Sequence, residues 1–152
     1  MKTNIFQKIN IKGKKIAIVQ ARFNEKITCG LKAGAVKALK EAGVKEADIG
    51  FFSVPGSVEI PLVCQKVART KKFDGIVALG AVVKGETAHF DYVAKMAADG
   101  IMKVMIEESF PIAFGVITVY DLKQAQKRSS DDKNNKGYEA ALALAEVLAI
   151  SL

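Results

Sequence analysis

The chain has 152 residues, half of them apolar and only three of them proline, a composition that predicts one folded domain with a sizeable core and excludes wholesale disorder. Its net charge is +7, but no aromatic residues alternate with the lysines as stacking platforms, so we expect no nucleic-acid partner. The apolar runs are shorter than the roughly 18 residues of a membrane helix. Because the N-terminus also lacks a signal peptide, we expect a cytoplasmic protein with no membrane partner.

The two cysteines and the single histidine argue against a metal site. Cys29 and Cys64 lie far apart in the sequence and match no metal-binding or redox spacing. The one histidine is His89, and there is no Cys-x-x-Cys motif. We therefore expect buried, reduced thiols and no bound metal.

Four apolar segments predict strands, and the first of them predicts a buried strand, because it is β-branched and apolar on both faces. They cover residues 14–21, 49–54, 75–83 and 111–119. Residues 4–10 could add a further strand before the first of these.

Amphipathic segments that follow the strands predict helices. They cover residues 28–43, 58–70, 89–109, 121–130 and 136–150. Thr28 is a candidate N-cap, Gly43 a helix stop, and Pro61 lies near a helix start, where its missing N–H costs little. The alternation of strands and helices along the whole chain predicts right-handed βαβ units, and hence a mostly parallel sheet covered by helices.

Ligands of such sheets bind at the carboxyl ends of the strands. Four segments follow the predicted strands directly: "ARFN" (21–24), "PGSVE" (55–59), "VKGETAH" (83–89) and "YDL" (120–122). These four segments are therefore the first places to search for chemistry.

The third of these segments combines an anion site with a histidine. Gly85 permits a tight turn, and Glu86 and Thr87 open the next helix, whose free N–H groups and threonine hydroxyl suit a phosphate. His89 lies on the first helical turn, where an imidazole could perform acid–base chemistry on a phosphorylated substrate. The alternative is a capped helix that carries a surface histidine.

The first two segments have both a binding and a structural interpretation. Phe23 could stack on a flat ligand ring or plug the end of the core, and Asn24 could bind a ligand or shape a turn. Ser57 and Glu59 could bind sugar-like hydroxyls, or could serve as an N-cap and a favourable charge at a helix start.

The most polar stretch of the chain is "KRSSDDKNNKG", residues 127–137. One interpretation is a solvated loop between two helices. The other is a binding segment, because Arg128 is a natural bidentate phosphate ligand and Lys136 opens the last helix.

Five segments, in this order and spacing, resemble the lumazine synthase family: "ARFN", "VPGSVEIP", "LGAVVKGETAHFDYV", "PIAFGVITV" and "NKGYEAA". The resemblance extends from Lys14 to Leu148. It implies a transferase of riboflavin biosynthesis that condenses 5-amino-6-(D-ribitylamino)uracil with 3,4-dihydroxy-2-butanone 4-phosphate. The products are 6,7-dimethyl-8-ribityllumazine, phosphate and water, and the family needs neither a metal nor an organic cofactor.

The resemblance also implies a role for each matched residue. The residues that would contact the pyrimidine ring and the ribityl chain are Phe23, Asn24, Ser57, Val58, Glu59, Val82 and Val83. Gly85, Glu86 and Thr87 would bind the phosphate, and His89 would transfer protons. In the family the neighbouring subunit supplies three further residues, which match Phe114 as a hydrophobic wall, Arg128 as a phosphate ligand and Lys136 as a ribityl-side contact.

The expected fold is a three-layer α/β/α sandwich with a mostly parallel, flavodoxin-like four-stranded sheet. We expect a single domain over residues 1–152, with an N-terminal arm at 1–13 and the core at 14–152. The resemblance further implies a homopentamer or a larger icosahedral shell of pentamers, with active sites between subunits and riboflavin synthase as a candidate partner.

Two other kinds of protein share this expected topology. A non-catalytic flavin- or lumazine-binding protein would keep Phe23 and Glu59 but would need neither His89 nor Arg128. A signalling receiver domain would have an acidic cluster after its first strand, where this chain reads "VQARFN". The enzyme is favoured because all four of these residues are present.

Overall fold

The fold is a four-stranded parallel sheet, seen here in a computed structural model that describes residues 5–152. The strands are β1 (Ile16–Ala21), β2 (Ile49–Val54), β3 (Gly75–Val83) and β4 (Ile112–Val119). They are arranged in the order β2-β1-β3-β4, and every neighbouring pair is parallel. All four predicted strands are confirmed.

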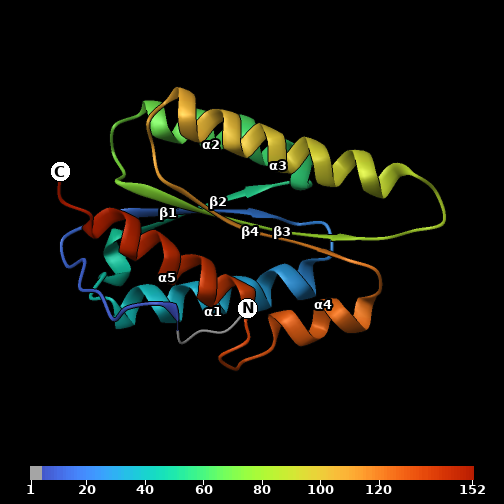
Figure 1. Ribbon diagram of the computed structural model, residues 1–152, viewed down its shortest axis with the longest axis horizontal. Coiled ribbons are helices and arrows are strands. Elements are labelled where there is room, and N and C mark those ends of the chain that lie inside the picture. Colours follow the sequence, from blue (N-terminus) through green and yellow to red (C-terminus); the bar gives the residue numbers. More distant parts are fainter. Residues whose placement is uncertain (1–4) are drawn as a thin grey trace.

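Helices cover both faces of the sheet and complete the predicted three layers (Figure 1). One face carries α2 (Ile60–Arg69) and α3 (His89–Glu107). The other carries α1 (Glu25–Glu41), α4 (Leu122–Ser129) and α5 (Lys136–Ala149). Two short 3-10 helices, η2 (Glu46–Asp48) and η3 (Ser57–Glu59), lie before and after β2.

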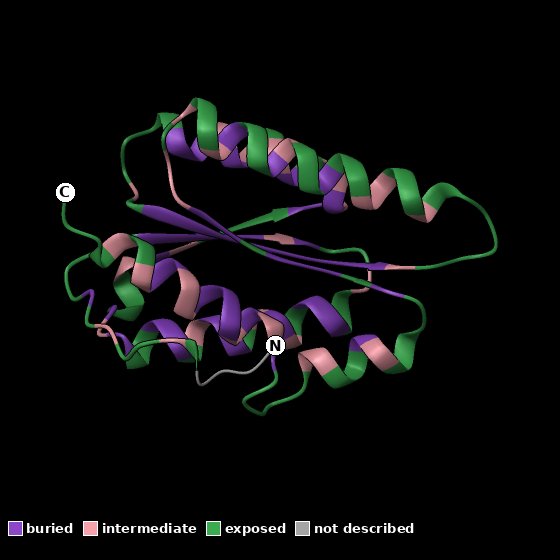
Figure 2. Cartoon of the chain, in the orientation of Figure 1, coloured by how far each residue is buried: buried purple, intermediate pink, exposed green. Residues whose placement is uncertain are grey.

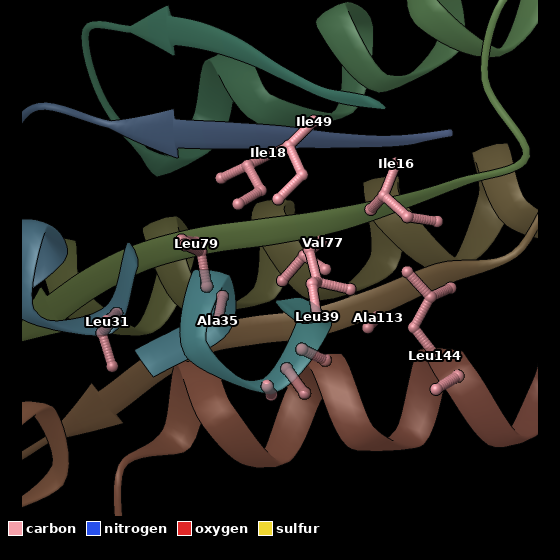
Figure 3. Close-up of a cluster of buried hydrophobic side chains, with 14 of the residues drawn as sticks. Ile16, Ile18, Leu31, Ala35, Leu39, Ile49, Val77, Leu79, Ala113 and Leu144 are labelled. Carbon is pink, nitrogen blue, oxygen red and sulfur yellow. The ribbon is translucent and has the colours of Figure 1, made fainter. Parts of the chain in front are cut away.

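The central strands β1 and β3 are apolar on both sides because each side supports a hydrophobic core, whereas residues 50–53 of the edge strand β2 are exposed or only partly buried (Figure 2). Successive strand residues point to opposite faces, so Ile18 packs toward α1 and α5, whereas Val19 packs toward α2 and α3. Figure 3 shows the first of these cores, in which side chains of the sheet meet Leu39 of α1 and Leu144 of α5. The burial of these faces fixes which helix lies on which side.

The expected N-terminal strand is not present in residues 5–10, and Asn4 lies outside the described residues. The segment instead lies against the helical layer, where Ile9 packs on the core and Ile11 is buried. The N–H of Ile11 donates to the carbonyl of Ala42, just after α1. Ile9 and Ile11 are thus covered without pairing with a strand, whereas Ile5 is exposed.

Helix α1 begins earlier than predicted, and Thr28 is not its N-cap. The N-cap is Asn24, whose backbone adopts the left-handed conformation with φ of 61°. Thr28 lies inside the helix and is buried, and its hydroxyl donates to the carbonyl of Glu25. Asparagine tolerates the left-handed region better than most residues, which allows the chain to turn directly from β1 into α1.

Only one of the two cysteines is buried. Burial raises the pKa of the Cys64 thiol to about 12, so this side chain stays protonated at neutral pH. Cys29 is exposed, so the expectation of a buried thiol is wrong there. The reason is its position on α1, where the core-facing stripe consists of Ile27, Leu31 and Ala35. Both thiols are free.

Glycines allow α1 and α5 to approach each other closely. A Cβ atom on Gly137 would lie 1.9 Å from the carbonyl oxygen of Leu31 in α1. Because that neighbour is backbone, the two helices would have to separate to make room. We therefore expect Gly137→Ala to lower the free energy of unfolding by about 2 kcal/mol, measured by chemical denaturation.

Gly85→Ala is the matched control for this stability measurement. A Cβ atom on Gly85 would meet no heavy atom within 4 Å. The control should unfold at the wild-type denaturant concentration. Equal stability of the Gly137 and Gly85 variants would show that the helices do not need their close approach.

Candidate active site

A cavity of about 320 Å³ opens at the carboxyl ends of β1, β2 and β3. Its wall comes from the segments that follow these strands and from the first turns of α3. Seven of the predicted site residues line it: Phe23, Ser57, Val58, Glu59, Val82, Val83 and His89. Residues that are far apart in the sequence therefore meet at one edge of the sheet, as the strand order requires.

The Phe23 ring is available for stacking because it is 71% exposed. This exposure rules out the alternative that Phe23 plugs the end of the core. Its backbone N–H donates to the carbonyl of Pro55 at 3.0 Å, which joins the loop after β1 to the loop after β2. Asn24 holds the same loop from the other side, since its side-chain amide donates to the carbonyl of Ala81 at 3.0 Å. The aromatic ring thus projects from a fixed backbone.

The segment after β2 forms the short helix η3 before α2 begins. Ser57 is buried, with its hydroxyl against Gly80 of β3, where a Cβ atom would lie 2.5 Å from it. No side-chain capping bond forms there, so the predicted N-cap role of Ser57 is wrong. Glu59 reaches back instead, and its carboxylate accepts a hydrogen bond from the N–H of Gly56 at 3.0 Å. The glutamate side chain is exposed in the wall of the cavity.

His89 is the first residue of α3, as predicted, and its side chain is exposed. Its backbone N–H donates to the hydroxyl of Thr87 at 3.3 Å. Gly85, Glu86 and Thr87 form an exposed loop that leads into the helix, beside the cavity rather than in its wall. An exposed imidazole next to a helix N-terminus can exchange protons with a ligand held there.

Phe114, Arg128 and Lys136 line a second cavity, also about 320 Å³, between β4, α4 and α5. Phe114 is 45% exposed on the edge strand β4. The Arg128 guanidinium is held at the end of α4, where it donates to the carbonyl of Gln124 at 3.2 Å. Lys136 is the first residue of α5.

The polar stretch that joins α4 to α5 is fixed rather than merely solvated. Asn135 is 2% exposed, and its side-chain amide donates to the carbonyls of Gly30 and Ser130. Its side-chain oxygen accepts from the N–H groups of Gly137 and Tyr138, which caps α5. The segment between Arg128 and Lys136 is therefore anchored to α1.

Glu139 is a residue of the second cavity that sequence reasoning missed. It is 3% exposed, and its carboxylate accepts a hydrogen bond from Lys136 at 2.8 Å. Its only sequence signal was a charge three residues after Lys136, on a mainly apolar helix.

The two cavities are separate: one opens at the carboxyl ends of β1, β2 and β3, and the other lies along the edge strand β4 beside α4 and α5. His89 belongs to α3, on the face that also carries α2, whereas Arg128 and Lys136 belong to α4 and α5 on the other face (Figure 1). No lining residue is shared between them. One chain therefore does not bring His89 and Arg128 to the same ligand.

Clustered metal ligands and helices of membrane-spanning length and hydropathy are both absent from residues 5–152. In this part of the chain, no group of three or more His, Cys, Asp and Glu side chains could hold a metal ion. None of the described helices combines the length and the hydropathy that crossing a membrane requires.

Comparisons with known proteins assign the chain to a family. The sequence model of the family described as 6,7-dimethyl-8-ribityllumazine synthase matches residues 13–151. A curated protein of that name from Desulfovibrio desulfuricans is 42% identical over 142 residues, which cover 93% of this chain and 91% of the relative. Another, from Leuconostoc mesenteroides, is 46% identical over 137 residues, which cover 90% and 88%. The chain therefore belongs to the 6,7-dimethyl-8-ribityllumazine synthase family.

Proposed function

We propose that this lumazine synthase condenses 5-amino-6-(D-ribitylamino)uracil with 3,4-dihydroxy-2-butanone 4-phosphate in a site that two neighbouring copies of the chain build together. Family membership makes the chain a transferase of riboflavin biosynthesis. The composite site is carried by one observation, the separation of His89 and Arg128 onto opposite faces of the sheet.

The first half of the proposed site holds the pyrimidine substrate. The Phe23 ring stacks on the pyrimidine, and Val82 and Val83 at the end of β3 contact the ring edge. Ser57 and Val58 lie along the ribityl chain, and the Glu59 carboxylate accepts hydrogen bonds from its hydroxyls. What supports these roles is that all of these residues border one cavity of about 320 Å³, a suitable size for a small ligand.

His89 is the proposed proton carrier. Schiff-base formation, loss of phosphate and ring closure each move a proton, and an imidazole does this near neutral pH. Gly85, Glu86 and Thr87 cradle the phosphate next to it, at the N-terminal end of α3. The exposure of both the loop and the histidine supports this assignment, because both are open to a ligand.

The second half of the proposed site comes from the neighbouring copy, which contributes Phe114, Arg128 and Lys136. A ring oligomer uses head-to-tail contacts, so each copy offers two different surfaces and completes two sites with two neighbours. We propose a homopentamer, alone or within a larger shell that also holds a riboflavin synthase. The exposed Phe114 on the edge strand supports this arrangement, since it offers an apolar wall to an adjacent chain.

Turnover tests the proposed function directly. The purified protein, incubated with both substrates, should produce the lumazine chromophore and release one phosphate for each chromophore formed. Omission of either substrate is the control. Binding of lumazine without turnover would contradict the proposal and would indicate a non-catalytic lumazine-binding protein.

Stacking by Phe23 gives a prediction for the first half of the site. Phe23→Ala should raise KM for the pyrimidine roughly tenfold, the scale of about 1–2 kcal/mol that aromatic stacking on a base-like ring contributes. Phe51→Ala is the matched control, because Phe51 is another exposed phenylalanine, on β2 and outside this cavity. An unchanged KM in a folded Phe23 variant would remove this ring from the site.

A further inference from the structure

Glu139 is a buried carboxylate with only half of its hydrogen-bonding capacity used. One oxygen accepts from the Lys136 ammonium at 2.8 Å, and the other is buried with no hydrogen-bond partner. Burying a carboxylate costs free energy unless it is paired, and a leucine would fit the apolar sequence of α5 without this cost. The retention of an ionisable side chain here therefore points to a role at the cavity that it lines.

The position of Lys136 at the start of α5 favours an anionic partner for its ammonium group. As the first residue of α5 it lies at the positive end of the helix dipole, which disfavours a cation. Glu139 follows one turn later, so the two side chains share one face of the helix. The ion pair holds the ammonium against the cavity wall and cancels its charge.

Arg128 differs from Lys136 in how its charge is compensated. Within residues 5–152 it forms no ion pair, and its guanidinium donates to a backbone carbonyl. The charged residues of the described cavity wall are Arg128, Lys136 and Glu139. The cavity therefore carries one uncompensated positive charge, at the arginine.

We infer that Glu139 is a specificity-determining residue. Because its carboxylate neutralises Lys136, the cavity has an uncharged end at Lys136 and a positively charged end at Arg128 that binds anionic ligands. At the neutral end, Lys136 donates hydrogen bonds to uncharged oxygens of the pyrimidine substrate. At the other end, Arg128 is the one cation of this described cavity wall that attracts the phosphate. This inference rests on the proposed function, because it assumes that this cavity is the half of the composite site that one copy offers to the substrates held by its neighbour.

Glu139→Gln tests the inference, since glutamine keeps the shape of the side chain and removes its charge. The cavity then holds two uncompensated cations. Inorganic phosphate should become a stronger competitive inhibitor against the phosphorylated substrate, with an inhibition constant lowered on the order of tenfold, the effect of one unit charge about 10 Å away at an effective dielectric constant of about 20. KM for the pyrimidine should rise while kcat changes little.

The double variant Glu139→Gln/Lys136→Gln separates charge from structure. It restores the net charge of the cavity, so the phosphate inhibition constant should return to the wild-type value, which a merely structural role of Glu139 would not produce. Glu108→Gln is the matched control, because Glu108 is also partly buried in an ion pair, with Arg69, but lies outside this cavity. Its phosphate inhibition should equal that of the wild type.

Wild-type turnover is measured first, so that a failure of the proposed function is recognised separately. With turnover present, unchanged phosphate inhibition in folded Glu139→Gln would overturn the inference. If Glu139→Gln does not fold, the double variant decides alone. Wild-type phosphate inhibition in the double variant supports Arg128 as the phosphate ligand, and weakened inhibition would show that Lys136 binds phosphate and overturn the inference.

Discussion

His89→Gln should lower kcat about 100-fold and leave KM for the phosphorylated substrate nearly unchanged. Glutamine can still form hydrogen bonds, but it cannot accept and release a proton near neutral pH. The proposed phosphate cradle before α3 would remain, because its N–H groups belong to the backbone. Steady-state kinetics of chromophore formation, with each substrate varied in turn, separates the two effects.

Asp91→Asn is the matched control for this measurement. Asp91 is an exposed residue of the same first turn of α3, and it does not line the cavity of His89. The control should retain the wild-type kcat. A wild-type kcat in His89→Gln itself would show that this histidine is a surface residue at a helix start, which was the alternative interpretation of the sequence.

Most of the secondary structure could be predicted because hydrophobic periodicity is a local property. Strand β3 has the predicted bounds, 75–83, and α3 starts at His89 as predicted. The start of α1 could not be predicted in the same way. It depends on the left-handed backbone of Asn24 and on its hydrogen bond to Ala81, a residue of another strand.

Burial of polar residues was the harder property to predict. Asn135 and Glu139 look like ordinary surface residues in the sequence, but α1, β4 and α5 pack around them. Cys29 shows the opposite error, since an apolar side chain turned out to lie on the outer face of its helix. Which face of a helix is buried at a given residue depends on neighbours far away in the sequence.

The two halves of the proposed site also differed in how far the sequence alone could predict which residues meet. Parallel strands end at one edge of a sheet, so the meeting of Phe23, Glu59 and His89 followed from the strand pattern alone. Arg128 and Lys136 follow the edge strand β4, and the chain returns from there to the opposite face. The order of segments in the sequence carries no sign of this separation by the sheet.

The mixing of two inactive variants tests the composite site most directly. His89→Ala chains keep Arg128, and Arg128→Ala chains keep His89, so each homogeneous variant should be nearly inactive. The two variants are co-expressed in equal amounts, and mixed assemblies are isolated with two different affinity tags. With random mixing, roughly a quarter of the sites would combine an intact His89 with an intact Arg128 from the neighbour.

Wild-type chains mixed with the double variant His89→Ala/Arg128→Ala serve as the control for random mixing. About a quarter of their sites would be intact if each site uses two chains, and about half if it uses one. The composite site predicts that the mixture of single variants regains about a quarter of the wild-type activity per chain. A fully mixed sample with no more activity than the separate variants would contradict it, because every site would then carry one defect.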